Sequence, residues 1–232
     1  MKLTPNHIQE LYKFTRQHYV YHYDVQSELV DHLANDIEEI WKDNPKISFE
    51  DARDKSFKKF GIFGFMDVIE AKQIQVGKKY RKILWRFIKD WFKLPKVILT
   101  LLIFIFFYSI MSLQINENYL LSFMLILGLV DGFYAYKITR KSKKRFEQKK
   151  VKYVLEDMIF NAGAFGSVLV FSNLFHLSSL IEYSNSVYYK SIVAFLITLA
   201  IIYSYVSLVV LPKKAEELLQ ETYPEYKLVK NL

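Results

Sequence analysis

Cysteine is absent from the sequence, and its 232 residues include only 7 glycines and 5 prolines. The absence of cysteine excludes a disulfide scaffold, thiol catalysis and cysteine-based zinc sites. So few glycines and prolines exclude collagen-like and linker-like chains. The sequence also has no glycine-rich phosphate loop, Gly-x-Ser-x-Gly elbow or aspartate-rich metal loop. We therefore expect no enzymatic activity, no catalytic residue, no cofactor and no resident metal.

Hydrophobic residues make up 52% of the chain and aromatic residues 17%, which excludes a disordered polypeptide. They are concentrated in four long runs, in which Asp131 is the single charged residue. A helix rises about 1.5 Å per residue, so runs of about 17–25 residues match a hydrocarbon core of about 30 Å. The sequence therefore predicts an all-α protein with a four-helix transmembrane bundle over residues 97–211. The spans are expected at about residues 97–113, 119–136, 158–181 and 191–211.

Charge is distributed unevenly along the chain. Residues 1–76 contain 10 Lys and Arg against 13 Asp and Glu, whereas residues 77–232 contain 22 against 11. The basic residues gather in two blocks, 78–96 and 137–152, and both adjoin apolar runs rather than covering one face of a soluble domain. We therefore expect the partners of these blocks to be the lipid bilayer and its anionic headgroups, and not nucleic acid.

The basic residues also predict an orientation. The connection over residues 137–152 contains nine Lys and Arg, residues 114–118 contain none, and residues 176–190 contain only Lys190. Because an excess of Lys and Arg stays on the cytoplasmic side, both termini are expected to be cytoplasmic and the protein integral to the cytoplasmic membrane. The first residues have no apolar stretch, so no cleaved signal peptide is expected.

The first 76 residues are predicted to form a small cytoplasmic helical domain, or head. Apolar residues at helical spacing predict helices at about residues 5–19, 24–41 and 49–60, with N-caps at Thr4 and Ser48. Residues 77–96 form a basic interfacial helix and linker, with Trp85 and Trp91 suited to the headgroup region. Residues 212–232 form a cytoplasmic tail, whose short amphipathic helix is expected to be able to dock on the head.

Three short motifs carry a resemblance to a known family: Glu28-Leu29-Val30-Asp31-His32-Leu33, Ser48-Phe49-Glu50-Asp51-Ala52 and Phe57-x-x-Phe60-Gly61. Together they resemble the HAAS-type helical domain over roughly residues 5–70. That domain stands at the N-terminus of many bacterial integral membrane proteins, including permease-prefix and four-helix types. The resemblance implies a sensing or regulatory membrane protein, and it implies no catalytic residue.

The head has one candidate interaction site. Glu28, His32, Asp36 and Glu39 form a polar strip along the edge of the buried face of helix 24–41. Carboxylates near an imidazole favour its charged form, so His32 is a candidate pH-sensitive contact or a contact with a partner. Imidazole nitrogen and carboxylate oxygen also bind divalent metals, so His32 and these acids are a candidate metal site. The alternative is that His32 hydrogen-bonds across a helix pair. His18 and His22 would share one face if their helix continued, but no Glu accompanies them as in H-E-x-x-H.

The candidate intramembrane site centres on Asp131, six residues before Lys137. An Asp within a span costs roughly 2.5–3.5 kcal/mol on insertion scales, so it should face protein rather than lipid. Asn161, Tyr205 and Ser207 are the expected partners at similar depth. Asp131 is then a candidate proton or cation site, or a polar switch within the bundle. Alternatively, it has a structural role, in which a protonated Asp131 holds helices together or its side chain extends toward Lys137.

These features predict a regulatory or sensing membrane protein whose head binds a protein partner. The alternative is a subunit of a small transporter or ion-coupled permease that uses Asp131. A membrane-embedded enzyme is a third class, and a homo-oligomer is compatible with each of them.

Overall fold

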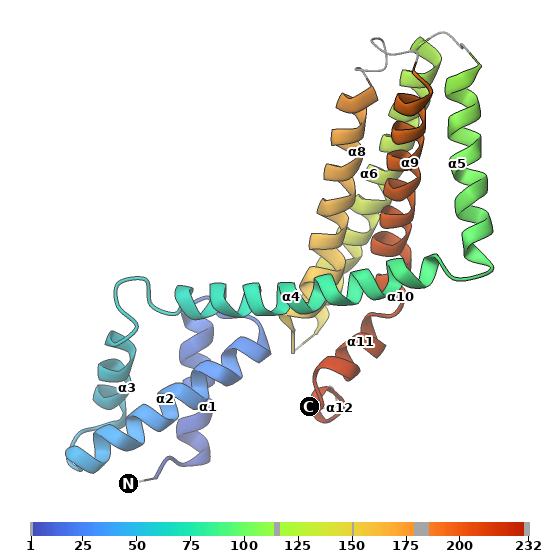
Figure 1. Ribbon diagram of the computed structural model, residues 1–232. Coiled ribbons are helices and arrows are strands. Elements are labelled where there is room, and N and C mark those ends of the chain that lie inside the picture. Colours follow the sequence, from blue (N-terminus) through green and yellow to red (C-terminus); the bar gives the residue numbers. More distant parts are fainter. Residues whose placement is uncertain (1, 114–116, 150, 179–185, 230–232) are drawn as a thin grey trace. The chain divides into compact units, whose positions relative to one another are not determined.

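A computed structural model describes residues 2–113, 117–149, 151–178 and 186–229 of the protein (Figure 1). Over these ranges the chain forms helices and no strand, which confirms the all-α prediction. The residues group into two compact units. The first comprises Met1–Lys78 with Lys149–Leu155, and the second comprises Lys79–Gln148 with Glu156–Leu232.

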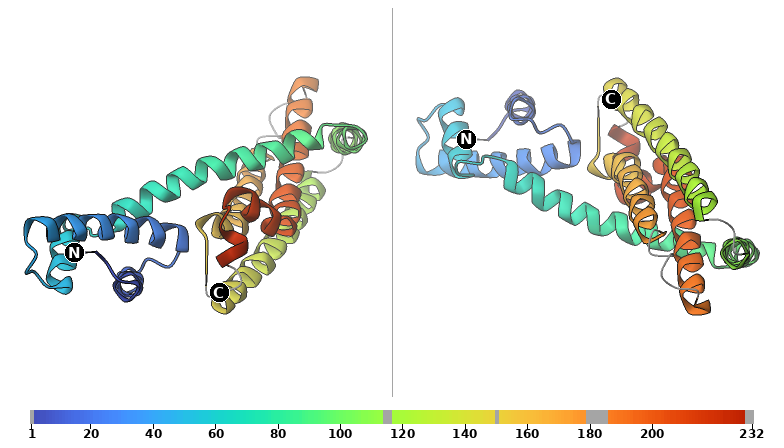
Figure 2. Two further views of the ribbon diagram at one scale, coloured as in Figure 1. Left: turned by 90° about the horizontal axis from the view of Figure 1, so that it is seen from below. Right: turned by 90° about the horizontal axis from the view of Figure 1, so that it is seen from above.

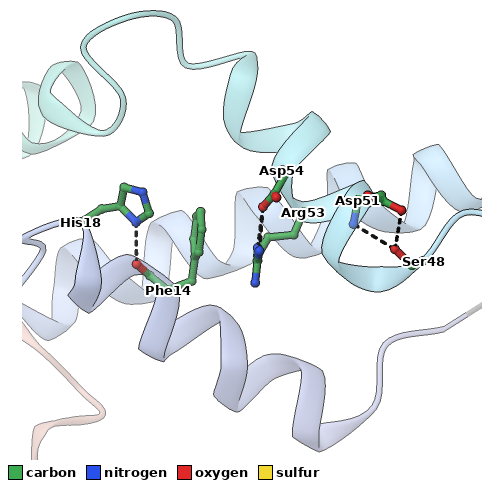
Figure 3. Close-up of polar contacts among 6 residues, drawn as sticks. All are labelled: Phe14, His18, Ser48, Asp51, Arg53 and Asp54. Carbon is green, nitrogen blue, oxygen red and sulfur yellow. Dashed lines mark hydrogen bonds and ion pairs between the residues drawn. The ribbon is translucent and has the colours of Figure 1, made fainter.

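The first unit, called the head below, contains three amphipathic helices with the bounds α1 Pro5–Gln17, α2 Tyr23–Asp43 and α3 Phe49–Lys58. Thr4 caps α1 and is followed by Pro5, and the Ser48 hydroxyl accepts a hydrogen bond of 3.1 Å from the Asp51 amide at the start of α3 (Figure 3). Both predicted caps are therefore confirmed. The α1 helix ends two residues earlier than expected, because the chain turns at Tyr19 with a φ of 65°.

The apolar faces of α1 and α2 form the centre of the head. Leu11 of α1 and Leu29, Leu33 and Ile37 of α2 are fully buried. Their spacing of three or four residues places them on one side of each helix, which is why the amphipathic pattern of the sequence predicts this packing. An aromatic cluster that includes Phe65 extends the core toward the turn after α3.

The segment Lys149–Leu155 also belongs to the head, although 70 residues separate it from the rest of that unit in sequence. Tyr153 is 1% exposed, and its ring meets the Tyr23 ring edge-on at 5.8 Å between centroids. The Tyr23 amide donates to the Lys152 carbonyl (2.7 Å), and the Val154 amide donates to the Asp24 carboxylate (3.3 Å). The head is thus built from two separate parts of the chain, whereas the sequence predicted a continuous domain ending at residue 76.

The long helix α4, Met66–Trp91, starts in the head and ends in the second unit. The other main helices of the second unit are α5 Lys96–Ser112, α6 Glu117–Gln148, α8 Gly163–Ser178 and α9 Val187–Tyr205. These four lie side by side, with α8 against α6 and α9, and α5 against α9 (Figures 1 and 2). The remaining elements are short: α7 Val154–Asp157, which passes from the head into the second unit, the π-helical turns η1 Met158–Ala162 and η3 Val206–Val210, and the helices α10 Leu211–Lys213, α11 Ala215–Thr222 and α12 Tyr226–Val229.

Three described stretches are long and apolar enough to cross a membrane: Ser122–Gln148, Val154–Leu174 and Val187–Lys213. They contain most of three of the spans expected from the sequence, and the predicted residues 179–181 lie outside the described chain. The first expected span coincides with α5, which is 17 residues long. It meets the same criterion only together with α4, from which it is bent by 84°, so three or four membrane crossings are compatible with the described chain.

The tail helix α11 groups with the second unit and not with the head. Its Glu221 carboxylate forms a two-pronged ion pair with the Arg86 guanidinium of α4, at 2.7 and 2.9 Å. Leu218 and Leu219 of the same helix are buried. Within the second unit, α11 is thus joined to α4 by an ion pair, and its docking on the head stays a prediction.

We predict that Tyr153→Ala destabilises the head of the full-length protein by about 3–5 kcal/mol, the usual loss for truncating a large buried aromatic side chain. Hydrogen exchange of the detergent-solubilised protein should show faster exchange in α1 and α2. The matched control is Tyr21→Ala, because Tyr21 lies in the same unit with 48% of its surface exposed. Equal exchange rates in the two variants would contradict a structural role for the returning segment.

Candidate functional sites

Asp131 lies on α6 with 6% of its surface exposed, and it faces the other helices of the second unit. Its Oδ1 accepts a hydrogen bond from the Ser204 hydroxyl of α9, and Ser167 of α8 lies beside the same carboxyl group. The other oxygen, Oδ2, is buried and has no hydrogen-bond partner among the described residues. One oxygen of this buried acid is thus bonded across the helix pair and the other is enclosed by protein.

The partners expected from the sequence have other neighbours in the described chain, and none of them hydrogen-bonds to this acid. The Asn161 amide donates to Asp157 one turn earlier, at 2.5 Å. Ser207 is fully buried beside the hydroxyls of Tyr80 and Tyr203. Tyr205 is 45% exposed, and its ring packs against Trp91 at 5.1 Å between centroids.

Sequence analysis did not single out Ser204 or Ser167. Depth along the span pointed to Tyr205 and Ser207, the neighbours of Ser204, but depth does not determine which side of the helix faces α6. The π-helical turn η3 begins at Val206 and changes the angular position of each residue after it. A regular period of 3.6 residues therefore assigns the wrong faces across this part of the span.

Two glycines of α8 allow close helix contacts near Asp131. A Cβ atom added to Gly163 would lie 2.9 Å from the Tyr80 hydroxyl oxygen and 3.5 Å from the Ser207 carbonyl oxygen. A Cβ atom at Gly166 would collide with the Tyr203 hydroxyl. The glycines thus bring two tyrosine hydroxyls against α8.

A cavity of about 780 Å³ opens beside Asp131 within the second unit. One face of α6 lines one wall, and the facing side of α9, η3 and α10 lines the other. Most of its lining is apolar, and the polar exceptions include Asp131, Ser204 and three lysines, Lys137, Lys141 and Lys213. Of the four predicted intramembrane residues, Asp131 and Tyr205 therefore meet at one cavity, while Asn161 and Ser207 do not line it.

The predicted polar strip of the head is divided by ion pairs. Glu28 binds the Lys72 ammonium of α4 at 2.7 Å, and Asp36 binds the Lys59 ammonium at 2.5 Å. Burial raises the pKa of the Asp36 carboxyl, but hydrogen bonds from Lys59 and Ser56 outweigh burial and hold that pKa below its usual value. The hydrogen bond to Asp36 raises the pKa of Lys59. Both groups therefore remain charged near neutral pH.

Three members of the strip line a hollow of about 340 Å³ between α2 and the end of α3. The lining residues are His32, Asn35, Asp36, Glu39, Ser56, Lys59 and Phe60. Glu28 lies outside it. The structure thus brings His32, Asp36 and Glu39 together, and it adds a cation and an aromatic ring that the sequence pattern did not associate with them.

The turn after this hollow exposes apolar side chains that sequence analysis did not recognise as a surface. Ile62, Phe63 and Met66 are 94%, 68% and 60% exposed. The turn is fixed by Gly61 and Gly64, which both have positive φ, and by Phe65, which is 3% exposed within the aromatic cluster. We call Ile62, Phe63 and Met66 the apolar turn. Large apolar side chains held outward by a rigid turn are typical of contact surfaces.

The two other head histidines do not share a helical face. His18 follows the end of α1, where its Nδ1 lies 2.8 Å from the Phe14 carbonyl oxygen (Figure 3) and its ring packs near Phe57 and Phe65. His22 precedes α2. The helical spacing that a two-histidine site requires is therefore interrupted at Tyr19. No group of three or more His, Asp or Glu residues in the described parts of the chain is arranged to hold a metal ion.

Comparison with known proteins adds no further assignment, because no family model, curated protein or solved structure matches the chain.

We predict that Gly163→Ala destabilises the second unit and that Tyr80→Phe, which removes the obstructing hydroxyl, relieves this effect. A coupling energy of about 0.5–3 kcal/mol is expected for such contacting residues, measured by thermal unfolding of the four members of the cycle in detergent. Gly128→Ala is the control, because a Cβ atom there meets nothing within 4 Å. Additive effects of the two substitutions would show that Tyr80 and Gly163 do not touch.

Proposed function

We propose that this chain is an integral protein of a bacterial inner membrane, with both termini cytoplasmic, whose head binds a protein partner and regulates or reports the state of the membrane bundle. The observation that carries the proposal is the surface of the head, where the polar hollow at Asp36 adjoins the apolar turn. An apolar patch rimmed by charged and hydrogen-bonding groups has the composition of a protein interface.

The returning segment Lys149–Leu155 supports the regulatory part of this proposal. It belongs to the head, and it continues directly into α6 on one side and into the α7, η1 and α8 span on the other. A partner that orders or loosens the head therefore acts on the ends of two candidate spans through the backbone itself. Tyr153 and the Asp24 carboxylate, which hold the segment in the head, are the contacts on which this coupling depends.

Two features of the sequence agree with the proposal. The motifs around His32, Ser48 and Phe57 resemble the HAAS-type domain, whose presence implies a sensing or regulatory membrane protein. The basic blocks at residues 78–96 and 137–152 favour a cytoplasmic position for the head under the positive-inside rule.

The experiment places a photo-crosslinking residue at Asn35 in the hollow, or at Ile62 on the apolar turn, of the full-length chain in its native membrane. Both positions are expected to cross-link to the same protein, and Phe63→Ser is expected to reduce capture severalfold, since interface aromatics commonly contribute more than about 1 kcal/mol. The control position is Gln9, an exposed residue of α1 outside this surface. Capture of lipid alone, or no product above that at Gln9, would refute partner binding here.

Transport is a second candidate, and the open oxygen of Asp131 at a large cavity is the observation that favours it. If the chain forms a proton pathway, Asp131→Asn should reduce proton flux into liposomes by at least about tenfold, because an amide does not exchange protons with a pathway. Lys143→Gln, which changes a residue outside the cavity, should leave the flux unchanged. Wild-type liposomes no more permeable to protons than empty ones would eliminate this candidate.

A further inference from the structure

The cavity at Asp131 has two chemically different regions. Leu127, Val130 and Ile201 are among the apolar residues that line one part. Lys137, Lys141 and Lys213 line another part of the same cavity. Helical rise separates Asp131 from Lys137 by about 9 Å along α6, so the acid lies deeper than the cations. The site therefore presents an apolar slot, a polar group at intermediate depth and a cationic rim.

The lysines at the rim are exposed, and none of them forms an ion pair within the described residues. Two arginines of the second unit are paired by contrast: Arg86 binds Glu221, and Arg145 binds Glu156 at 3.2 Å. Three neighbouring ammonium groups without a counter-ion attract an anion, and the apolar walls beside them favour one that carries a hydrocarbon chain.

We infer that this cavity binds one anionic phospholipid, whose phosphate lies among Lys137, Lys141 and Lys213 and whose acyl chain occupies the apolar slot. The inference depends on the proposed membrane location of the second unit, and it goes beyond general attraction of basic residues to headgroups by assigning a defined site. The cavity volume of about 780 Å³ is within the range of roughly 300–1,000 Å³ that is usual for small-molecule sites.

Asp131 gives this site a polar contact at the depth of the lipid's ester groups. Its unbonded Oδ2 belongs to a side chain that is more than nine-tenths buried and that lines the cavity. Ser204 holds the carboxyl group through Oδ1, and Oδ2 is itself buried, so Asp131 adds polarity to this part of the lining without being exposed to solvent.

A second copy of the chain is a poorer occupant of this groove. A symmetric contact through the same face would bring the three lysines of one copy against those of the other, and like charges repel. The anionic lipid instead neutralises them. Charge complementarity thus favours lipid over self-association at this surface.

The test uses the full-length protein in nanodiscs that contain phosphatidylglycerol and phosphatidylcholine with identical acyl chains. Native mass spectrometry is expected to show one retained phosphatidylglycerol per chain and a preference for it over phosphatidylcholine. The triple variant Lys137→Gln, Lys141→Gln and Lys213→Gln should lose at least about tenfold in affinity for phosphatidylglycerol, given about 1 kcal/mol for each lysine near an anionic surface.

The matched control removes the same charge elsewhere, with Lys143→Gln, Lys144→Gln and Lys227→Gln at exposed positions outside the cavity. It should retain the lipid. Val130→Trp fills the slot without changing charge and should also displace the lipid, and because Val130 is 49% exposed the substitution does not disturb the core.

Equal loss of lipid in the control triple variant, or no preference between the two lipids, would overturn the inference in favour of general surface attraction. A dimer that forms as phosphatidylglycerol is lost would overturn it in favour of self-association. Resistance to carbonate extraction measures membrane integration separately. Cross-linking from the head measures partner binding. A wild-type protein that shows no preference between the two lipids, with both of these intact, therefore contradicts this inference alone.

Discussion

Hydrogen bonding of the backbone in an apolar environment is the constraint on which the second unit depends. Where water is excluded, each peptide N–H and C=O group needs a partner within the chain, and a continuous helix supplies it locally. The apolar sequences of α5, α6, α8 and α9 accordingly form long helices. The same constraint gives importance to the few polar side chains among them, because a buried polar atom without a partner is costly, and Asp131 Oδ2 is such an atom.

The secondary structure of this protein follows closely from local sequence signals. The caps at Thr4 and Ser48 and the helix spacing of the head depend on neighbouring residues, so the sequence was sufficient to predict them. The long apolar runs predicted the helices of the second unit for the same reason. The boundary at Tyr19 was missed because a positive φ at a tyrosine depends on tertiary packing and is rare.

The candidate sites were less accessible from the sequence because they depend on facing helices. Asp131 was identifiable as a lone charge in an apolar run, but its partner Ser204 was not, since depth along a span does not determine which side of α9 faces α6. In the head, the ion pair between Asp36 and Lys59 joins residues 23 positions apart, on elements whose contact no local pattern encodes. The cavity and its lysine rim likewise require α6 and α10 to be placed together.

The return of residues 149–155 to the head has an evolutionary consequence. A domain encoded by one uninterrupted stretch passes between genes in a single recombination event, whereas a domain completed by a distant stretch leaves part of itself behind. Transfer of the first 78 residues alone onto another membrane protein would expose the surface that Tyr153, Val154 and Leu155 bury. The head and the spans are therefore inherited together, and substitutions at Tyr23 or Asp24 are constrained by residues encoded far downstream.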